Sequence, residues 1–193
     1  MSIRDTGSGY ENSRPMFARL KRYLRIQSLR MALWASDVRI AHGVRIVALS
    51  GDVRQCNILT ARIDDALTLL RRTHPAVYAR ATRYVAVLAA ISLHGRVGEY
   101  VHELKTCLID SEYASSSNVG PVQIAIIIAH EASHARVRAA GIPFCEATST
   151  RIERGAVRSE ISILKRLPDR SNLLAWATER MTRTMRDAPP DKD

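Results

Sequence analysis

The sequence is poor in cysteine and in aromatic residues, and each shortage disfavours a class of protein. Three cysteines occur among 193 residues, and such a sparse, odd set does not form a disulfide framework. Free thiols suit a reducing compartment, so we expect a cytoplasmic protein. Aromatic residues make up 5% of the chain, and no zinc-finger spacing occurs. These shortages disfavour the common nucleic-acid-binding modules.

Apolar leader segments, internal repeats and glycine-rich phosphate loops are also lacking. Residues 1–15 are polar, contain no apolar run of the kind found in signal peptides, and are predicted to be a disordered tail. With 46% hydrophobic residues, the chain is long enough to bury a core. We predict a single domain over residues 16–186, followed by a polar terminus at residues 187–193.

Acidic residues are in the minority, and the formal net charge is +10. Such a charge attracts phosphates and anionic lipids. The basic residues occur in nearly every segment rather than in one binding motif, so a nucleic acid is not the expected main partner. Residues 16–35 are predicted to form a basic amphipathic helix that is too charged to span a bilayer. This helix either packs on its own domain or lies on an anionic membrane surface.

Periodicity indicates an α+β chain. Asp37–Leu49 alternates like a strand, either as one strand with a bulge at Gly43 or as a hairpin that turns at His42 and Gly43, and His42 is interpreted as a turn residue. Asn57–Arg83 has helical spacing that breaks at His74-Pro75. The next segments are a buried strand at Tyr84–Ser92 and a turn at Leu93–Gly98. Two extended segments follow, at Tyr100–Leu104 and at Thr106–Asp110. His102, in the first of these, is interpreted as a structural residue.

The sharpest chemical signal is an HExxH motif within Pro121–Gly141, which is predicted to be one helix. A proline at its start, a glycine at its end and apolar residues on every side favour a buried helix. His130 and His134 project from one face and can bind one Zn²⁺ ion. Glu131 lies about 100° round the helix and is placed to act as a general base.

A catalytic zinc needs a third protein ligand, and Glu153 is the leading candidate. Eighteen residues separate His134 from Glu153, which lies in a second predicted helix beyond a break at Gly141-Ile142-Pro143. Glu153 has an alternative interpretation as the capping-box partner of Thr150. The competing ligands are Glu146, Glu160 and Cys145.

The motif followed by this glutamate resembles the gluzincin zinc metallopeptidases, the group of thermolysin and the zinc aminopeptidases. The resemblance covers roughly Lys105–Leu167 and is nearest to the minimal gluzincins. It implies a small zincin-like α+β domain with a three- to four-stranded sheet, the buried motif helix and a glutamate-bearing helix. It further implies one Zn²⁺ per chain, held by His130, His134 and Glu153, and Glu131 as the base for hydrolysis of a peptide or protein substrate.

The sequence departs from this group in two respects. Thermolysin-like enzymes have an acidic residue four positions after the third ligand, where this chain has Val157. Glu160, seven positions after Glu153, lies on the same helical face and is the candidate for a supporting role. The exopeptidase motif of the aminopeptidases is not visible.

In the group resembled, the strand before the motif helix is a sheet edge to which an extended peptide adds. Cys107–Tyr113 is therefore the predicted substrate wall. Tyr113 either donates to a developing oxyanion or packs as an ordinary aromatic residue. A further helix is predicted at Ser171–Met185, without readable chemistry. The alternatives to a peptidase are a non-catalytic zinc protein and a basic protein that binds nucleic acid or a membrane surface.

Overall fold

The protein is described by a computed structural model over residues 14–167 and at Leu173. The predicted tail at residues 1–15 lies outside this range except for its last two residues, which begin the first helix. The predicted helix at Ser171–Met185, apart from Leu173, and the terminus at 187–193 also lie outside it. The chain divides into two compact units, with the boundary after Ala35.

The first unit contributes the helix α1, Arg14–Ala35. The predicted basic amphipathic helix is therefore present and begins two residues before Met16. Within the described residues, no helix combines the length and the apolar character needed to cross a membrane.

The second unit is an α+β domain built on a five-stranded mixed sheet, which has one strand more than the predicted maximum of four. The strand order is β1-β2-β3-β5-β4, in which β2, β3 and β5 are parallel and the two outer strands are antiparallel to their neighbours. The strands are β1 Val38–Ala41, β2 Val44–Ala48, β3 Val87–Ile91, β4 Gly98–Val101 and β5 Thr106–Asp110.

The additional strand arises at the first turn. His42 and Gly43 have φ angles of 57° and 76°, which make a two-residue turn between β1 and β2. Of the two arrangements left open by the sequence, the hairpin is therefore the one that forms. His42 is confirmed as a turn residue, and its ring contacts the Tyr78 hydroxyl at 3.2 Å and the Asp64 carboxylate at 3.1 Å.

The helices mostly follow the predicted segments, and the break at His74-Pro75 is confirmed. Two boundaries were wrong: helix continues to Tyr84, so β3 starts at Val87, and His102–Leu104 forms the 3-10 helix η1 rather than extended chain. The remaining helices of this unit are α2 Val53–Thr73, α3 Pro75–Tyr84, α4 Ser111–Ser115, α5 Pro121–Ala139 and α6 Glu146–Leu164.

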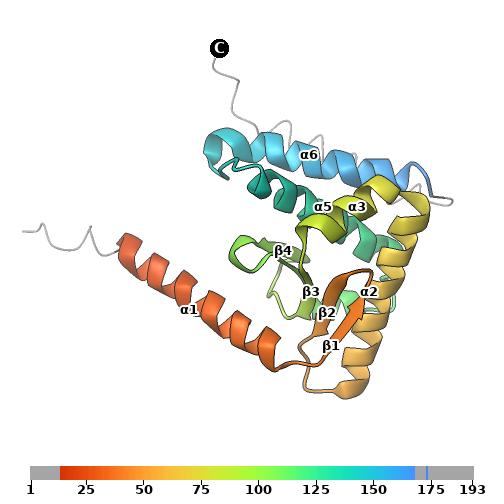
Figure 1. The fold of residues 1–193 in the computed structure, drawn as a ribbon, viewed down its shortest axis with the longest axis horizontal. Helices are drawn as coiled ribbons and strands as arrows, with labels where there is room; N and C mark the ends of the chain where they lie inside the picture. The colour runs from red at the N-terminus through yellow and green to blue at the C-terminus, as the bar shows by residue number, and fades with distance from the viewer. Residues whose placement is uncertain (1–13, 168–172, 174–193) are drawn as a thin grey trace, which may run out of the picture. The chain divides into compact units, whose positions relative to one another are not determined.

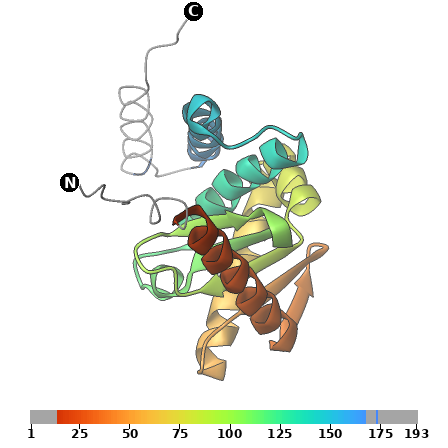
Figure 2. The ribbon, with the colours of Figure 1, turned by 90° about the vertical axis from the view of Figure 1, so that its left-hand side faces the viewer.

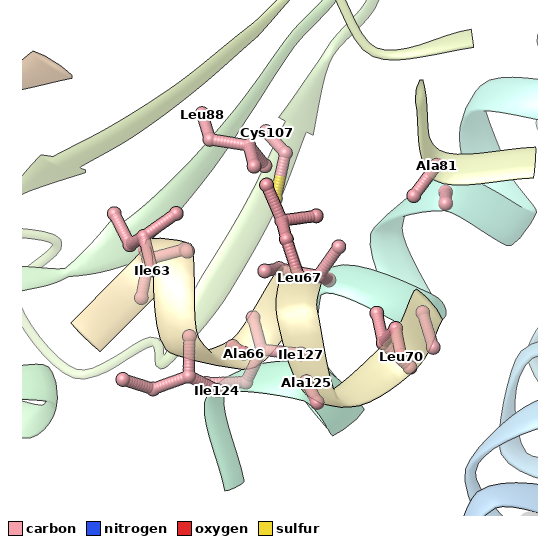
Figure 3. Close-up of a cluster of buried hydrophobic side chains, with 14 of the residues drawn as sticks. Ile63, Ala66, Leu67, Leu70, Ala81, Leu88, Cys107, Ile124, Ala125 and Ile127 are labelled. Carbon is pink, nitrogen blue, oxygen red and sulfur yellow. The ribbon is translucent and has the colours of Figure 1, made fainter. Parts of the chain in front are cut away.

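One face of the sheet forms the core with α2 and α5. Ile46, Leu88 and Cys107 are register partners across β2, β3 and β5, so their side chains form one row on that face. Figure 3 shows Leu88 and Cys107 beside Leu67 of α2, and Ile124 of α5 belongs to the same cluster of buried side chains. Each such apolar side chain contributes about 1.5–3 kcal/mol through its burial. Figures 1 and 2 both show α6 beside α5, on the side away from the strands.

The predicted substrate wall is not the sheet edge. β5 lies between β3 and β4, where Cys107 pairs with Leu88 on one side and Tyr100 on the other. The prediction that Cys107–Tyr113 forms an edge was therefore wrong. The edge strand on this side is β4, which contacts α5.

Candidate metal centre

Helix α5 brings His130 and His134 together at the core of the candidate site. Pro121 occupies the first turn of α5 and Gly141 follows it with a φ of 73°, as the start and end signals predicted. The four-residue spacing places the two rings on one face, and their Nε2 atoms lie 2.9 Å apart. Each imidazole therefore directs its Nε2 atom at the same point.

Glu153 reaches this point from α6. Its carboxylate oxygens lie 3.4 Å from the Nε2 atom of His130 and 3.4 Å from that of His134. The capping-box interpretation of Glu153 was wrong, because α6 begins at Glu146 and Thr150 lies inside the helix. Glu153 thus lies beside the two histidines, on the second helix that the sequence predicted.

The three side chains suit a zinc ion in type and in spacing. Their ligand atoms all lie within 4.8 Å of one another. Tetrahedral zinc with bonds of about 2.0–2.2 Å separates its ligand atoms by about 3.3 Å, close to the separations in this cluster. Two imidazoles and one carboxylate are also the donor set of a catalytic zinc site that keeps one position open.

The competing ligands are placed elsewhere or are not described. Cys145 is exposed at the N-cap of α6, and its thiol lies 3.5 Å from the Thr148 hydroxyl. The side chain of Glu146 lies outside the described part of the chain. Glu160 approaches His130 from the other side of its ring. Among the described residues, the group able to hold a metal is His130, His134 and Glu153.

Glu160 binds the second nitrogen of His130. Its carboxylate oxygen lies 2.5 Å from Nδ1 of His130, and the Glu160 side chain is fully buried. A carboxylate at Nδ1 keeps the proton on that nitrogen and leaves Nε2 with a lone pair for a metal. Val157, at the position where an acidic residue was expected, is buried and apolar. The supporting carboxylate therefore comes from seven positions after Glu153 instead of four.

The carboxylates around His130 control its protonation when no metal is bound. Burial alone would lower the pKa of His130, but hydrogen bonds to Glu153 and Glu160 outweigh it and raise the pKa to about 9. A cationic His130 thus balances the negative charge of its partners. A metal cation bound at Nε2 of His130 would replace the proton on that nitrogen.

Glu131 is nearly buried beside the cluster, with 7% of its surface exposed. Burial raises the pKa of its carboxyl to about 7, although His130 and a hydrogen bond from the backbone of Tyr100 oppose the shift. The side chain lies close to the edge strand, because a Cβ atom at Gly98 would come within 3.0 Å of its Oε1. Glu131 therefore lies between the cluster and β4, with a pKa suited to proton transfer at neutral pH.

Two side chains that the sequence did not suggest, His74 and Arg80, help to hold α6 in place. Nε2 of His74, at the start of α3, donates to the backbone oxygen of Ser162 at 2.8 Å. Arg80 of α3 donates to the hydroxyls of Ser133 and Ser159, on α5 and α6, at 3.3 and 3.1 Å. These contacts determine how α6 lies along α5 and hence where Glu153 and Glu160 point.

His130 and Glu131 line two cavities. The larger, about 690 Å³, has walls that are mostly apolar and include Val97, Ile126 and Ile127. The smaller, about 330 Å³, is lined by polar and charged residues that include Arg96, Glu99, Tyr100, His134, Arg138 and Glu153. Gly98 of β4 borders both cavities, so an extended chain lying along this strand would pass the cluster.

Tyr113 lines the larger cavity and also packs against the hydrophobic core. Burial raises the pKa of its hydroxyl, so the phenol stays protonated. Arg62 of α2 supports the segment that follows Tyr113. Its guanidinium donates to the backbone oxygens of Ser116 and Val119 at 2.8 and 3.2 Å. His102 lies outside the cluster, exposed in η1 and beside the ring of Tyr100.

Comparisons of this chain with protein-family models, with curated proteins and with solved structures find no match.

Proposed function

We propose that the protein is a zinc-dependent hydrolase of peptide bonds with a zincin-like catalytic domain of the minimal gluzincin type. The observation that carries this proposal is the convergence of His130, His134 and Glu153 on one point, with Glu131 beside it. The buried carboxylate of Glu160 behind His130 supports it, because such a partner orients a metal-binding imidazole.

Zinc bound by the three residues would supply Lewis acidity toward a carbonyl oxygen and toward water. Glu131 takes a proton from the attacking water at its carboxylate and delivers it to the nitrogen of the leaving amine. Burial raises the pKa of the Glu131 carboxyl above its ordinary value, which makes its carboxylate a stronger base. Glu160 holds the Nδ1 proton of His130 throughout and keeps that ring in one orientation.

The edge strand β4 and the two cavities favour a peptide as the substrate. An extended peptide can add to a sheet edge through backbone hydrogen bonds. Along β4 it would carry its reacting carbonyl past Glu131 and would run beside both the apolar and the charged cavity, since Gly98 of β4 lines both. We expect cleavage beside a large apolar side chain, which fits a cavity of about 690 Å³.

The test is hydrolysis of a mixed peptide library by the zinc-loaded protein and by Glu131→Gln, with products read by mass spectrometry. We expect the wild type to cleave, and Glu131→Gln to retain zinc while losing at least about a hundredfold in rate, as removal of a general base does. Glu112→Gln, an exposed substitution of the same kind on α4, is the control and should cleave normally.

Equal cleavage by wild type and Glu131→Gln would contradict the assigned base. A wild-type protein that holds zinc in this cluster but cleaves no peptide would contradict the peptidase proposal and favour a non-catalytic zinc protein.

A further inference from the structure

Helix α1 has an exposed apolar stripe. Taken at about 100° per residue, its members fall within an arc of roughly 120° on the helix surface. Gln27 also falls within this arc and interrupts the stripe between Leu24 and Met31. Exposed apolar side chains gathered on one face mark an interaction site more often than scattered ones do. Its members are exposed to between 51% and 78% and are Met16, Phe17, Leu20, Tyr23, Leu24, Met31 and Trp34.

The same helix carries positive charge without any acidic residue. At the helical spacing, Arg19 and Arg30 border one margin of the apolar stripe and Lys21 borders the other. Arg22 and Arg25 add further positive charge on the remaining surface, which also carries the buried side chains of Leu29 and Leu33. A partner of α1 must therefore accept apolar side chains at the centre of the contact and cations along its margins.

We propose that α1 binds the surface of an anionic lipid bilayer, lying in the interface with its apolar stripe among the acyl chains. Helices with a basic polar face and tryptophan, phenylalanine and leucine on the other face bind in this way. Arg19, Lys21 and Arg30 then meet the lipid headgroups. The proposal is independent of the zinc site.

The charge pattern disfavours other partners. A second copy of α1 would place cations against cations, because the helix has no acidic residue to pair with them. A nucleic acid would satisfy the cations but would leave the apolar stripe in water. An anionic bilayer satisfies the stripe and its basic margins together.

The experiment is co-sedimentation of the full chain with vesicles of phosphatidylcholine, with and without phosphatidylglycerol. We expect strong binding only to the anionic vesicles. Leu20→Gln combined with Leu24→Gln keeps the charge and the helix propensity, and should weaken binding at least about tenfold. Arg19→Gln combined with Lys21→Gln should also weaken it. Val53→Gln combined with Ile58→Gln replaces exposed apolar residues of α2 and should leave binding unchanged.

A fluorescence measurement locates the contact. The chain has two tryptophans, so Trp176→Phe leaves Trp34 as the single indole. Its emission should shift to shorter wavelength with anionic vesicles and not with neutral ones. Absence of vesicle binding, binding that the Leu20 and Leu24 substitutions do not weaken, or binding to duplex DNA in place of vesicles would overturn the proposal.

Discussion

The hydrogen bond between His130 and Glu160 is one of the contacts that join the two helices of the candidate site. Glu160 is fully buried, and a buried carboxylate is costly unless it is hydrogen-bonded or paired with a charge. His130 provides that partner at 2.5 Å. The pair therefore fixes the ring of His130, and with it the direction of the nitrogen that faces Glu153.

Glu160→Gln tests this role. The substitution keeps the size of the side chain but removes the charge that holds the Nδ1 proton, so zinc affinity should fall about 10- to 100-fold. Competition with a chromophoric chelator measures the affinity. Glu112→Gln is the matched control, and an affinity for Glu160→Gln equal to that of the control would contradict the role of Glu160.

Glu131 is predicted to lower the stability of the metal-free protein at neutral pH. Its folded-state pKa is about 7 and its ordinary value is 4.5, so the folded chain binds this proton more tightly than the unfolded chain does. Its contribution to stability is therefore complete below pH 4.5 and is lost as the pH rises to about 7. Because the residue is nearly buried, the loss is of the order of 3 kcal/mol.

Glu131→Gln has no charge to bury and should avoid this loss. In chelator-treated protein, we expect the variant to exceed the wild type in free energy of unfolding by about 2–3 kcal/mol above pH 7. The difference should shrink toward pH 4.5. Urea unfolding at a series of pH values measures it, and a difference that stays constant with pH would count against this account of Glu131.

At the scale of elements, the close approach of β4 to α5 depends on Gly98. A Cβ atom there would lie 2.6 Å from Cγ2 of Ile127 and 3.0 Å from Oε1 of Glu131. The absence of a side chain therefore lets the edge strand lie directly against the helix that carries the motif. This contact brings the backbone of Tyr100 to the Glu131 carboxylate.

Gly98→Ala should lower the free energy of unfolding by about 1–3 kcal/mol, because the new methyl group overlaps well-packed atoms. Gly155→Ala, on α6, is the matched control. Its Cβ atom meets nothing within 4 Å, and alanine favours a helix over glycine by about 0.8–1 kcal/mol. Thermal or urea unfolding compares the two, and similar effects from both would contradict the close packing at Gly98.

Local signals account for the elements that the sequence predicted well. Pro121 and Gly141 delimit α5, and the helical spacing of its histidines follows directly from its period. The position of β4 could not be predicted in the same way, because strand order depends on pairing between distant segments. Cys107 and Tyr100 are close in sequence, yet nothing local shows which of them lies on the edge strand.

The candidate site, too, could be predicted only where local signals within one helix determine it. Spacing within one helix brings His130 and His134 together, whereas the partner of Nδ1 depends on how α6 lies along α5. That placement depends on His74 and Arg80, which contact α6 from α3. These contacts join residues far apart in sequence, so periodicity indicated Glu160 only as a residue on the right face.

At the scale of the whole molecule, the candidate zinc ligands tie α6 to a helix of the core. The proposed zinc ion would bind the folded chain through residues of both helices, so zinc should raise the free energy of unfolding. The gain is about 2.7 kcal/mol when free zinc is a hundredfold above its dissociation constant. The core itself rests on the apolar faces of α2, α5 and the sheet.

The most direct test of the metal centre is the zinc content of the full chain, purified without added metal and compared with Glu153→Ala. Elemental mass spectrometry should find about one zinc per wild-type chain, held in the three-ligand site, and much less in the variant. A wild-type protein that contains no zinc, even after reconstitution with the metal, would contradict the account of His130, His134 and Glu153 as a metal centre.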